Sequence, residues 1–236
     1  MKRTLLCDLD DTLFDHSGAT RDALAVVRES SAAFQTWTLD EFDRHHRVVL
    51  EHLHLQVLAG RWTVEEARVE RFRQLLASAG VHESRTAVLD GLSWGYRHAY
   101  EAAWRMIPGA IELVAEAKAR DWHVVIVTNN VVREQRLKVE RGGLTSHIDA
   151  LVTSEEFGAS KPDPAILHHA IERVGALAKG AVVFGDSLTT DVAGARAAQL
   201  RVVWFNRTRA ASPDASLVEL HALEPTATAL RVLSGD

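Results

Sequence analysis

The chain has 236 residues, of which 47% are hydrophobic and 25% are charged, and its formal net charge is −5. This length and composition fit one sizeable domain, or one domain that carries a smaller inserted one. The net negative charge argues against the basic surface that nucleic-acid binding requires, so we expect no nucleic-acid partner. No apolar run approaches the roughly 20 residues that cross a bilayer, so we expect no membrane partner.

The start of the chain and its single cysteine both bear on the compartment. The stretch MKRTLLCDLD offers only about four apolar residues before an acid, whereas a signal peptide needs an apolar region of roughly 7–15 residues. Cys7 has no second cysteine with which to form an internal disulfide. We therefore expect a cytoplasmic protein.

Five short apolar runs predict the strands of a parallel sheet. The last four alternate with helix-like segments, which is typical of buried parallel strands joined by crossover helices. The runs are TLLC (4–7), HVVIV (123–127), IDALV (148–152), AVVF (181–184) and RVVWF (201–205). Helical spacing behind a proline predicts helices over 108–121 and 162–175, and a last helix is expected to start near Glu224 and Pro225. We expect an α/β fold in which a Rossmann-like parallel sheet is flanked by helices.

The segment between the first and second predicted strands has a different pattern. Amphipathic stretches at 18–34, 39–58, 64–79 and 84–104 carry apolar residues along one face, with no comparable strand run among them. Four helices that each bury one face against the others form a small bundle. We therefore expect an α-helical domain over 15–105, inserted into an α/β core formed by 1–14 and 106–236.

Polar side chains follow the predicted strands at the points where the strands end. In an open parallel sheet, ligands bind outside the carboxyl ends of the strands, near the switch in strand order. Each such residue alone could be a turn former, but a coherent set at four strand ends favours a ligand site. The residues concerned are Asp8, Asp10, Asp11, Thr128, Asn129, Asn130, Lys161 and Asp186.

These residue types suit a divalent cation together with a phosphate group. Clustered carboxylates raise one another's pKa unless a cation lies among them, and Mg²⁺ prefers oxygen ligands. Lys161 would balance the acids and an anionic substrate, while Thr128 and backbone N–H groups at a helix start suit a phosphate. An aspartate is also a known nucleophile in phosphoryl transfer. The sequence thus predicts a site for Mg²⁺ and phosphate at this edge of the sheet.

Four segments resemble the motifs of the haloacid dehalogenase-like hydrolase superfamily, in that family's order and with suitable spacing. They are DLDDT (8–12), TNN (128–130), SKPDPAIL (160–167) and GDSLTTDVAGA (185–195). The resemblance covers essentially the whole chain. It implies that the helical segment is the cap that this family places after its first motif.

The resemblance implies catalytic roles for three residues. Asp8 would be the nucleophile that forms an aspartyl-phosphate, and Lys161 would orient it and offset negative charge. Asp10 would protonate the leaving oxygen and then act as general base on the hydrolytic water. Dehalogenases of this superfamily lack an acid at the position of Asp10, because a carbon–halogen bond needs no protonated leaving group. Asp10 therefore favours the phosphatase branch.

The resemblance also implies the binding residues. Mg²⁺ would be bound by Asp8, the backbone carbonyl of Asp10 and Asp186, with support from Thr12 and Asp191. The transferring phosphoryl group would be held by Thr128, Asn129 and the turn at Asp11. Family phosphatases usually carry glycine or asparagine at the position of Asp11, so we expect Asp11 to act mainly through its backbone.

Particular members of the family suggest the substrate. DLDDTLF, TNN and VVWFNR (202–207) resemble bacterial pyrimidine nucleotidases, and DLDDTLFDHSGATRDAL resembles N-acylneuraminate-9-phosphate phosphatases. The resemblance implies a small phosphorylated metabolite as substrate, with a nucleoside monophosphate as first candidate. We expect the protein to be a monomer or homodimer.

Two alternatives to a phosphatase stay open. A phosphosugar mutase would use the same aspartyl-phosphate chemistry but must shield the intermediate from water, and the cap decides this. A non-catalytic phosphate-binding regulatory protein on the same fold is expected to have lost one of its four central residues. All four are retained, so this second alternative is the weaker one: Asp8, Asp10, Lys161 and Asp186.

Overall fold

The computed structural model describes residues 2–236, apart from the side chain of Leu58, and the chain divides into two compact units. One unit consists of the residues up to Asp15 together with Arg105–Asp236, and the other is His16–Trp104. The first unit has an α/β architecture and the second is built from helices. Each is described by itself below.

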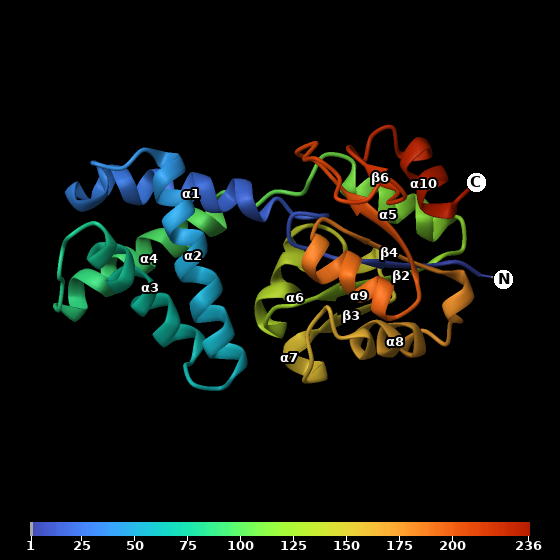
Figure 1. Ribbon diagram of the computed structural model, residues 1–236, viewed down its shortest axis with the longest axis horizontal. Coiled ribbons are helices and arrows are strands. Elements are labelled where there is room, and N and C mark those ends of the chain that lie inside the picture. Colours follow the sequence, from blue (N-terminus) through green and yellow to red (C-terminus); the bar gives the residue numbers. More distant parts are fainter. Residues whose placement is uncertain (1) are drawn as a thin grey trace. The chain divides into compact units, whose positions relative to one another are not determined.

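The α/β unit is built on a six-stranded sheet in which every pairing is parallel, as Figure 1 shows. Its strand order is β3-β2-β1-β4-β5-β6. The strands are β1 (Thr4–Cys7), β2 (His123–Thr128), β3 (Ala150–Thr153), β4 (Ala181–Gly185), β5 (Arg201–Phe205) and β6 (Glu219–Leu220). The prediction of a Rossmann-like α/β fold is confirmed, and each of the five apolar runs overlaps a strand. The two-residue edge strand β6 is too short to produce an apolar run, so it was not predicted.

Helices cover both faces of this sheet. On one face α5 and α10 pack against each other and contact β2 and β4, whereas α8 and α9 pack together on the other face (Figure 1). Helix α6 contacts β3. The helices of this unit are α5 (Ala110–Ala119), α6 (Val132–Arg141), α7 (Ser154–Phe157), α8 (Pro164–Arg173), α9 (Ala193–Ala197) and α10 (Thr226–Ser234).

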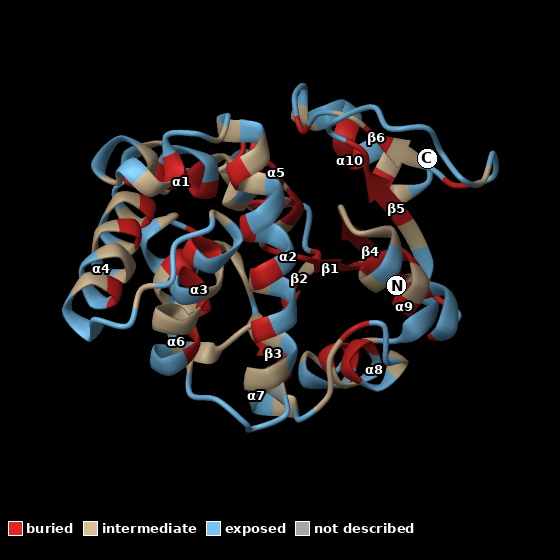
Figure 2. Cartoon of the chain, turned by 60° about the vertical axis from the view of Figure 1, so that its left-hand side comes forward, coloured by how far each residue is buried: buried red, intermediate tan, exposed pale blue. Residues whose placement is uncertain are grey.

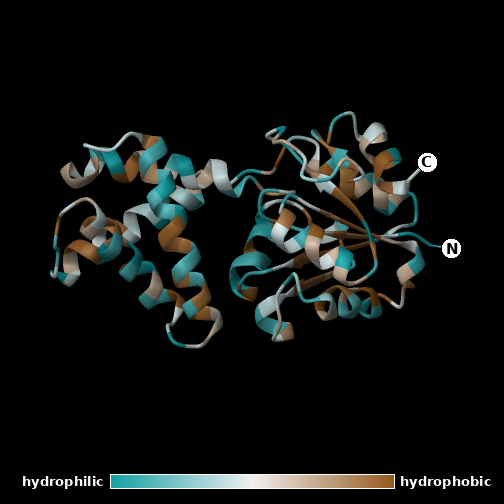
Figure 3. Ribbon diagram, viewed as in Figure 1, coloured by the Kyte–Doolittle hydropathy of each residue, from teal (hydrophilic) through white to brown (hydrophobic). Residues whose placement is uncertain are grey.

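The strands form the centre of the core. Every residue of β1 and β4 is buried, including neighbours such as Leu5 and Leu6 that point to opposite faces. These two strands are red in Figure 2, and the sheet is largely brown in Figure 3. A sheet that is covered on both faces has continuous apolar strands instead of alternating ones. Because the strands are buried along their length, polar residues next to the sheet lie beyond the strand ends.

The second unit consists of four α-helices and one short 3₁₀ turn. Helix α1 packs against α2 and α4, and α3 packs against α2 and α4. Threonine capping boxes start two of the helices, because Thr38 and Thr63 each accept from the backbone of a glutamate three residues later. The elements are α1 (His16–Ser30), the turn Ala32–Phe34, α2 (Leu39–Leu58), α3 (Val64–Ser78) and α4 (Thr86–Ala102). Across the described residues 2–236, no helix has both the length and the apolar character needed to span a membrane.

Candidate active site

The strand order changes direction beside β1, and this places two acids next to each other. The chain fills β1, β2 and β3 outward on one side and then returns to add β4 on the other side of β1. Asp8 follows β1 and Asp186 follows β4, and the Asp8 N–H donates to the Phe184 carbonyl at 2.9 Å. Ligands of open α/β sheets bind at such a switch point.

Lys161 connects the residues around Asp8. Its side chain is buried, and its Nζ donates to Asp8 Oδ1 at 2.6 Å, to Asp191 Oδ1 at 2.7 Å and to the Val127 carbonyl at 2.7 Å. These three bonds use all three donors of the ammonium group. The lysine is therefore held in one orientation against the Asp8 carboxylate.

Asn129 holds the backbone of Lys161. The Asn129 side chain donates to the Lys161 carbonyl and accepts from the Lys161 N–H, each at 2.7 Å. This pair joins the loop after β2 to the loop that precedes α8. Thr128, the last residue of β2, is buried directly before it. The sequence assigned Asn129 to phosphate binding, and the structure adds that its amide side chain positions the lysine.

The charges of this site are out of balance. Burial alone would lower the pKa of Lys161, but its bonds to Asp191 and Asp8 outweigh burial and raise it. Burial raises the pKa of Asp8 well above its usual value, although the positive charge of Lys161 acts in the opposite direction. Burial, together with the negative charges of Asp191 and Asp11, raises the pKa of Asp186 to about 7. The site thus holds three clustered carboxylates, two of which share one ammonium group, and the excess negative charge favours a cation.

The donor set fits a hard divalent cation such as Mg²⁺. Asp8, Asp186 and Asp191 each offer an oxygen, and these three oxygens lie within 4.8 Å of one another. Asp191 already accepts from Lys161 at Oδ1 and from the Ser187 N–H at Oδ2, at 2.7 and 3.1 Å. Asp8 and Asp186 therefore keep more acceptor capacity for an ion than Asp191 does. Hard cations of this kind are bound by carboxylate oxygens and water.

The loop after β4 brings the third carboxylate into the cluster. Asp191 lies in a single π-helical turn, Leu188–Val192, a form that is frequent at functional sites. A Cβ atom built on Gly185 would lie 2.2 Å from the Asp191 carboxyl group, so only glycine permits this approach.

Two side chains hold Asp186: Trp204 Nε1 donates to the Asp186 carbonyl at 2.7 Å, and Thr12 Oγ1 donates to Asp186 Oδ1 at 3.4 Å. These contacts give Asp186 a defined position.

Asp11 shapes the turn after β1. It adopts a left-handed backbone conformation with φ 63°, which aspartate tolerates better than most residues. Its N–H donates to the Phe14 carbonyl at 2.7 Å, and Arg207 Nη2 lies 3.6 Å from its Oδ1. The Asp11 backbone thus closes the turn, and its carboxylate faces an arginine.

Asp10 accepts hydrogen bonds from three side chains, of which the sequence analysis identified Asn130 but not Gln135 or Lys138. Lys138 Nζ donates to Asp10 Oδ1 at 2.7 Å, and Gln135 Nε2 and Asn130 Nδ2 donate to Oδ2 at 2.9 and 3.3 Å. Gln135 and Lys138 belong to α6. Their spacing of three residues places them on one helix face, but polar residues at that spacing usually form a solvated face. Only their burial in the folded chain reveals the contact.

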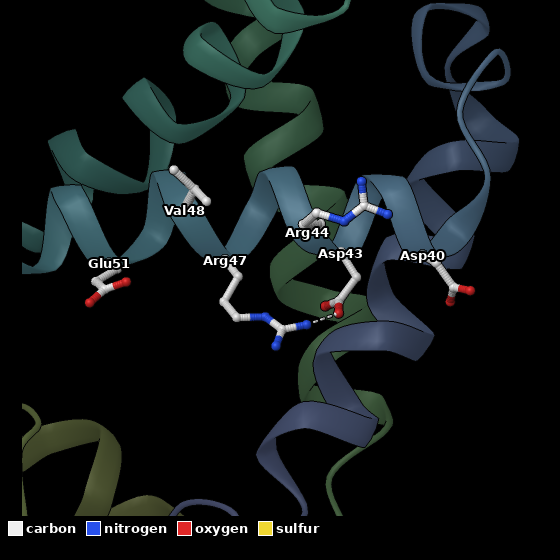
Figure 4. Close-up of a pocket in the computed structure, with 6 residues that line it drawn as sticks. All are labelled: Asp40, Asp43, Arg44, Arg47, Val48 and Glu51. Carbon is white, nitrogen blue, oxygen red and sulfur yellow. Dashed lines mark hydrogen bonds and ion pairs between the residues drawn. The ribbon is translucent and has the colours of Figure 1, made fainter. Parts of the chain in front are cut away.

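A separate surface hollow lies along α2 in the helical unit. It is lined by residues of this one helix, and Figure 4 shows that they are almost all charged. Arg47 Nη2 and Asp43 Oδ2 form an ion pair at 2.5 Å, and both belong to the ordinary i, i+4 pattern of an exposed helix face. The lining residues are Asp40, Asp43, Arg44, Arg47, Val48 and Glu51. None of them was predicted as a site residue.

Residues 2–199 match the haloacid dehalogenase-like hydrolase family. The chain belongs to this family. The match includes all four segments that resembled its motifs, from DLDDT at 8–12 to GDSLTTDVAGA at 185–195. The predicted family is therefore confirmed.

Individual relatives within the haloacid dehalogenase-like family are similar over most of their length. The HAD-hydrolase YfnB of Bacillus subtilis is 29% identical over 205 residues, which is 86% of this chain and 84% of YfnB. A crystal structure of YfnB bound to magnesium has a TM-score of 0.76 and covers 98% of this chain and 99% of that one. The phosphoserine phosphatase of Thermus thermophilus is 30% identical, covering 91% and 93% of the two chains. The pyrimidine 5'-nucleotidase YjjG of Escherichia coli is 26% identical, covering 92% and 94%.

Proposed function

We propose that this haloacid dehalogenase-like protein is a Mg²⁺-dependent phosphomonoester hydrolase that acts through an aspartyl-phosphate at Asp8. The observation that carries the proposal is the buried contact of Lys161 with Asp8 and Asp191, beside Asp186 and at the switch point of the sheet. Relatives named for phosphatase activity support the same reaction class. The substrate is a small phosphorylated metabolite, with a nucleoside monophosphate as first candidate.

The first half of the reaction transfers the phosphoryl group to the protein. An Asp8 carboxylate oxygen attacks phosphorus, the bond from phosphorus to the ester oxygen breaks, and Asp10 gives its proton to the departing oxygen. Lys161 holds Asp8 and offsets negative charge as the phosphoryl group approaches. Bound at Asp8, the backbone carbonyl of Asp10 and Asp186, with support from Asp191 and Thr12, Mg²⁺ would supply further neutralisation of phosphoryl charge.

The second half restores the enzyme. Asp10, now ionised, takes a proton from a water molecule, and the water oxygen attacks the phosphorus of the aspartyl-phosphate. The bond between phosphorus and the Asp8 oxygen breaks, which releases inorganic phosphate. Thr128, the amide of Asn129 and the turn at Asp11 hold the phosphoryl oxygens in both halves.

We further propose that the helical unit His16–Trp104 serves as the cap that selects the substrate. Its position in the sequence, directly after the first motif, supports this role. We also propose a cytoplasmic monomer or homodimer. The single cysteine, Cys7, is fully buried, so a structural disulfide plays no part.

The proposed function is tested with a panel of phosphorylated metabolites, including nucleoside monophosphates, phosphoserine and sugar phosphates. We expect release of inorganic phosphate in the presence of Mg²⁺, loss of release with EDTA, and recovery when Mg²⁺ is added in excess. The values of kcat/KM across the panel then identify the substrate class. An isomerised sugar phosphate without phosphate release would indicate a mutase, and binding without turnover would indicate a regulatory protein.

Replacement of Asp10 by asparagine tests the proposed acid and base. Asparagine keeps the size of the side chain but cannot exchange a proton, so kcat/KM for alkyl phosphates is expected to fall by about 10²–10⁴-fold. An activated aryl phosphate needs little help for its leaving group, so its kcat/KM should fall much less. Equal losses for both substrate classes would contradict the role given to Asp10.

A further inference from the structure

Lys138 is a buried lysine that the reaction above does not use. Its side chain has 0% exposure, and Nζ lies 2.7 Å from Asp10 Oδ1 and 3.4 Å from Glu134 Oε1. The same Nζ lies 4.8 Å from the centre of the Phe14 ring. The ammonium group is thus enclosed by two carboxylates and an aromatic face.

Both oxygens of Asp10 are held from the same helix face. Lys138 donates to Oδ1, whereas Gln135, one helical turn earlier on α6, donates to Oδ2 at 2.9 Å. Gln135 is also fully buried. Two donors on two different oxygens fix the plane of a carboxylate as well as its position, which a single ion pair does not do.

A purely structural role does not explain these two residues well. Removing a lysine from water costs several kcal/mol, and a buried ion pair is often no more stabilising than apolar side chains of similar volume. The fold has apolar side chains at comparable positions, such as Val139 on the same helix, which is buried. Gln135 and Lys138 instead both donate to the carboxylate of Asp10, and Lys138 pairs in addition with Glu134.

We propose that Lys138 is a positioning residue for Asp10, with Gln135 as its second tether. This inference rests on the proposed phosphatase function, in which Asp10 transfers a proton in both halves of the reaction. Proton transfer requires the acid and the reacting oxygen to lie within hydrogen-bond distance, and a displacement of about 1 Å can cost about 10²-fold in rate. In this role Lys138 and Gln135 restrain the Asp10 carboxylate by its two oxygens and affect the transfer only through Asp10.

The test compares Lys138→Met, Lys138→Arg and Gln135→Leu with the wild-type protein. Each is assayed with an alkyl phosphate from the productive class of the panel and with p-nitrophenyl phosphate. For Lys138→Met we expect kcat/KM for the alkyl phosphate to fall by about 10²-fold, and kcat/KM for the aryl phosphate to fall by less than about threefold. The value of kcat for the aryl phosphate should fall, because Asp10 must still activate water, and the aspartyl-phosphate should then accumulate. Gln135→Leu should show the same signature with a smaller loss, and Lys138→Arg should recover part of the activity.

Lys118→Met is the matched control. Lys118 lies on α5 of the same unit and pairs with Asp149 at 2.6 Å, in a partly exposed position without a role in the proposed reaction. Its removal should leave both substrates unchanged. If Lys138→Met fails to fold, Gln135→Leu alone decides, because it removes a tether without removing a charge.

The outcomes separate the inference from the function on which it rests. A wild-type protein without turnover of any phosphomonoester overturns the proposed phosphatase function and, with it, the role of Lys138. An active wild type whose Lys138→Met and Gln135→Leu variants lose both substrates equally, or lose neither, overturns the positioning role alone. A selective loss on alkyl phosphates supports it.

Discussion

Replacing Asp8 by asparagine is expected to abolish turnover, with a loss on the order of 10⁴–10⁶-fold. Asparagine has nearly the same shape, but its amide cannot attack phosphorus and form the aspartyl-phosphate. Release of inorganic phosphate measures the loss. Mass spectrometry of protein quenched during turnover should detect a phosphorylated wild type and no phosphorylation of the variant.

A matched substitution on the surface controls for this change. Asp121 is exposed, pairs with Lys2 and adopts a left-handed conformation that asparagine also tolerates, so Asp121→Asn should keep full activity. Full activity in Asp8→Asn would show that another residue is the nucleophile, or that the reaction has no covalent intermediate.

Replacing Lys161 by methionine is expected to remove both stability and activity. The variant leaves Asp8, Asp191 and the Val127 carbonyl without their shared donor in a buried site. Breaking a buried pair by removing one partner costs about 3–5 kcal/mol in free energy of unfolding. Urea unfolding of the metal-free protein measures this loss, and the phosphate-release assay measures activity.

Lys118→Met again provides the comparison, because its pair with Asp149 is about one-quarter exposed on each side. Partly exposed pairs contribute roughly 0–1 kcal/mol, so this variant should unfold close to the wild-type midpoint. A Lys161→Met variant that is as stable as Lys118→Met would mean that water or a cation reaches the Asp8 site and replaces the ammonium group.

The fold could be predicted because short apolar runs, and the polar residues that end them, identify the strands without knowledge of distant contacts. A strand that is buried on both faces must be apolar along its length, as in AVVF at 181–184, and a polar residue marks where burial ends. β6 escaped prediction because two residues are too few to show a pattern. The apolar run IDALV starts at Ile148, whereas β3 starts at Ala150, since apolar composition does not specify where pairing begins.

The candidate site was only partly predictable. Asp8 and Asp186 could be placed together because the ends of neighbouring parallel strands lie at one edge of the sheet. The contacts of Gln135 and Lys138 with Asp10 could not be predicted, because the sequence does not show whether a helix face with polar and charged residues is buried or exposed. The close approach of the Asp191 carboxyl group to Gly185 could not be predicted either, since it depends on the absence of a Cβ atom at Gly185 and on a π-helical turn.

The sequence by itself therefore determined the alternation of strands and helices, the helices between the first two strands and the acids at the strand ends. These features depend on local patterns and on the polarity of residues where burial stops. Only the tertiary structure decided which charges meet: Lys161 with Asp8 and Asp191, and Lys138 with Asp10. Such pairs join positions 30 to 153 residues apart, and their contacts follow from how helices and loops pack onto the sheet.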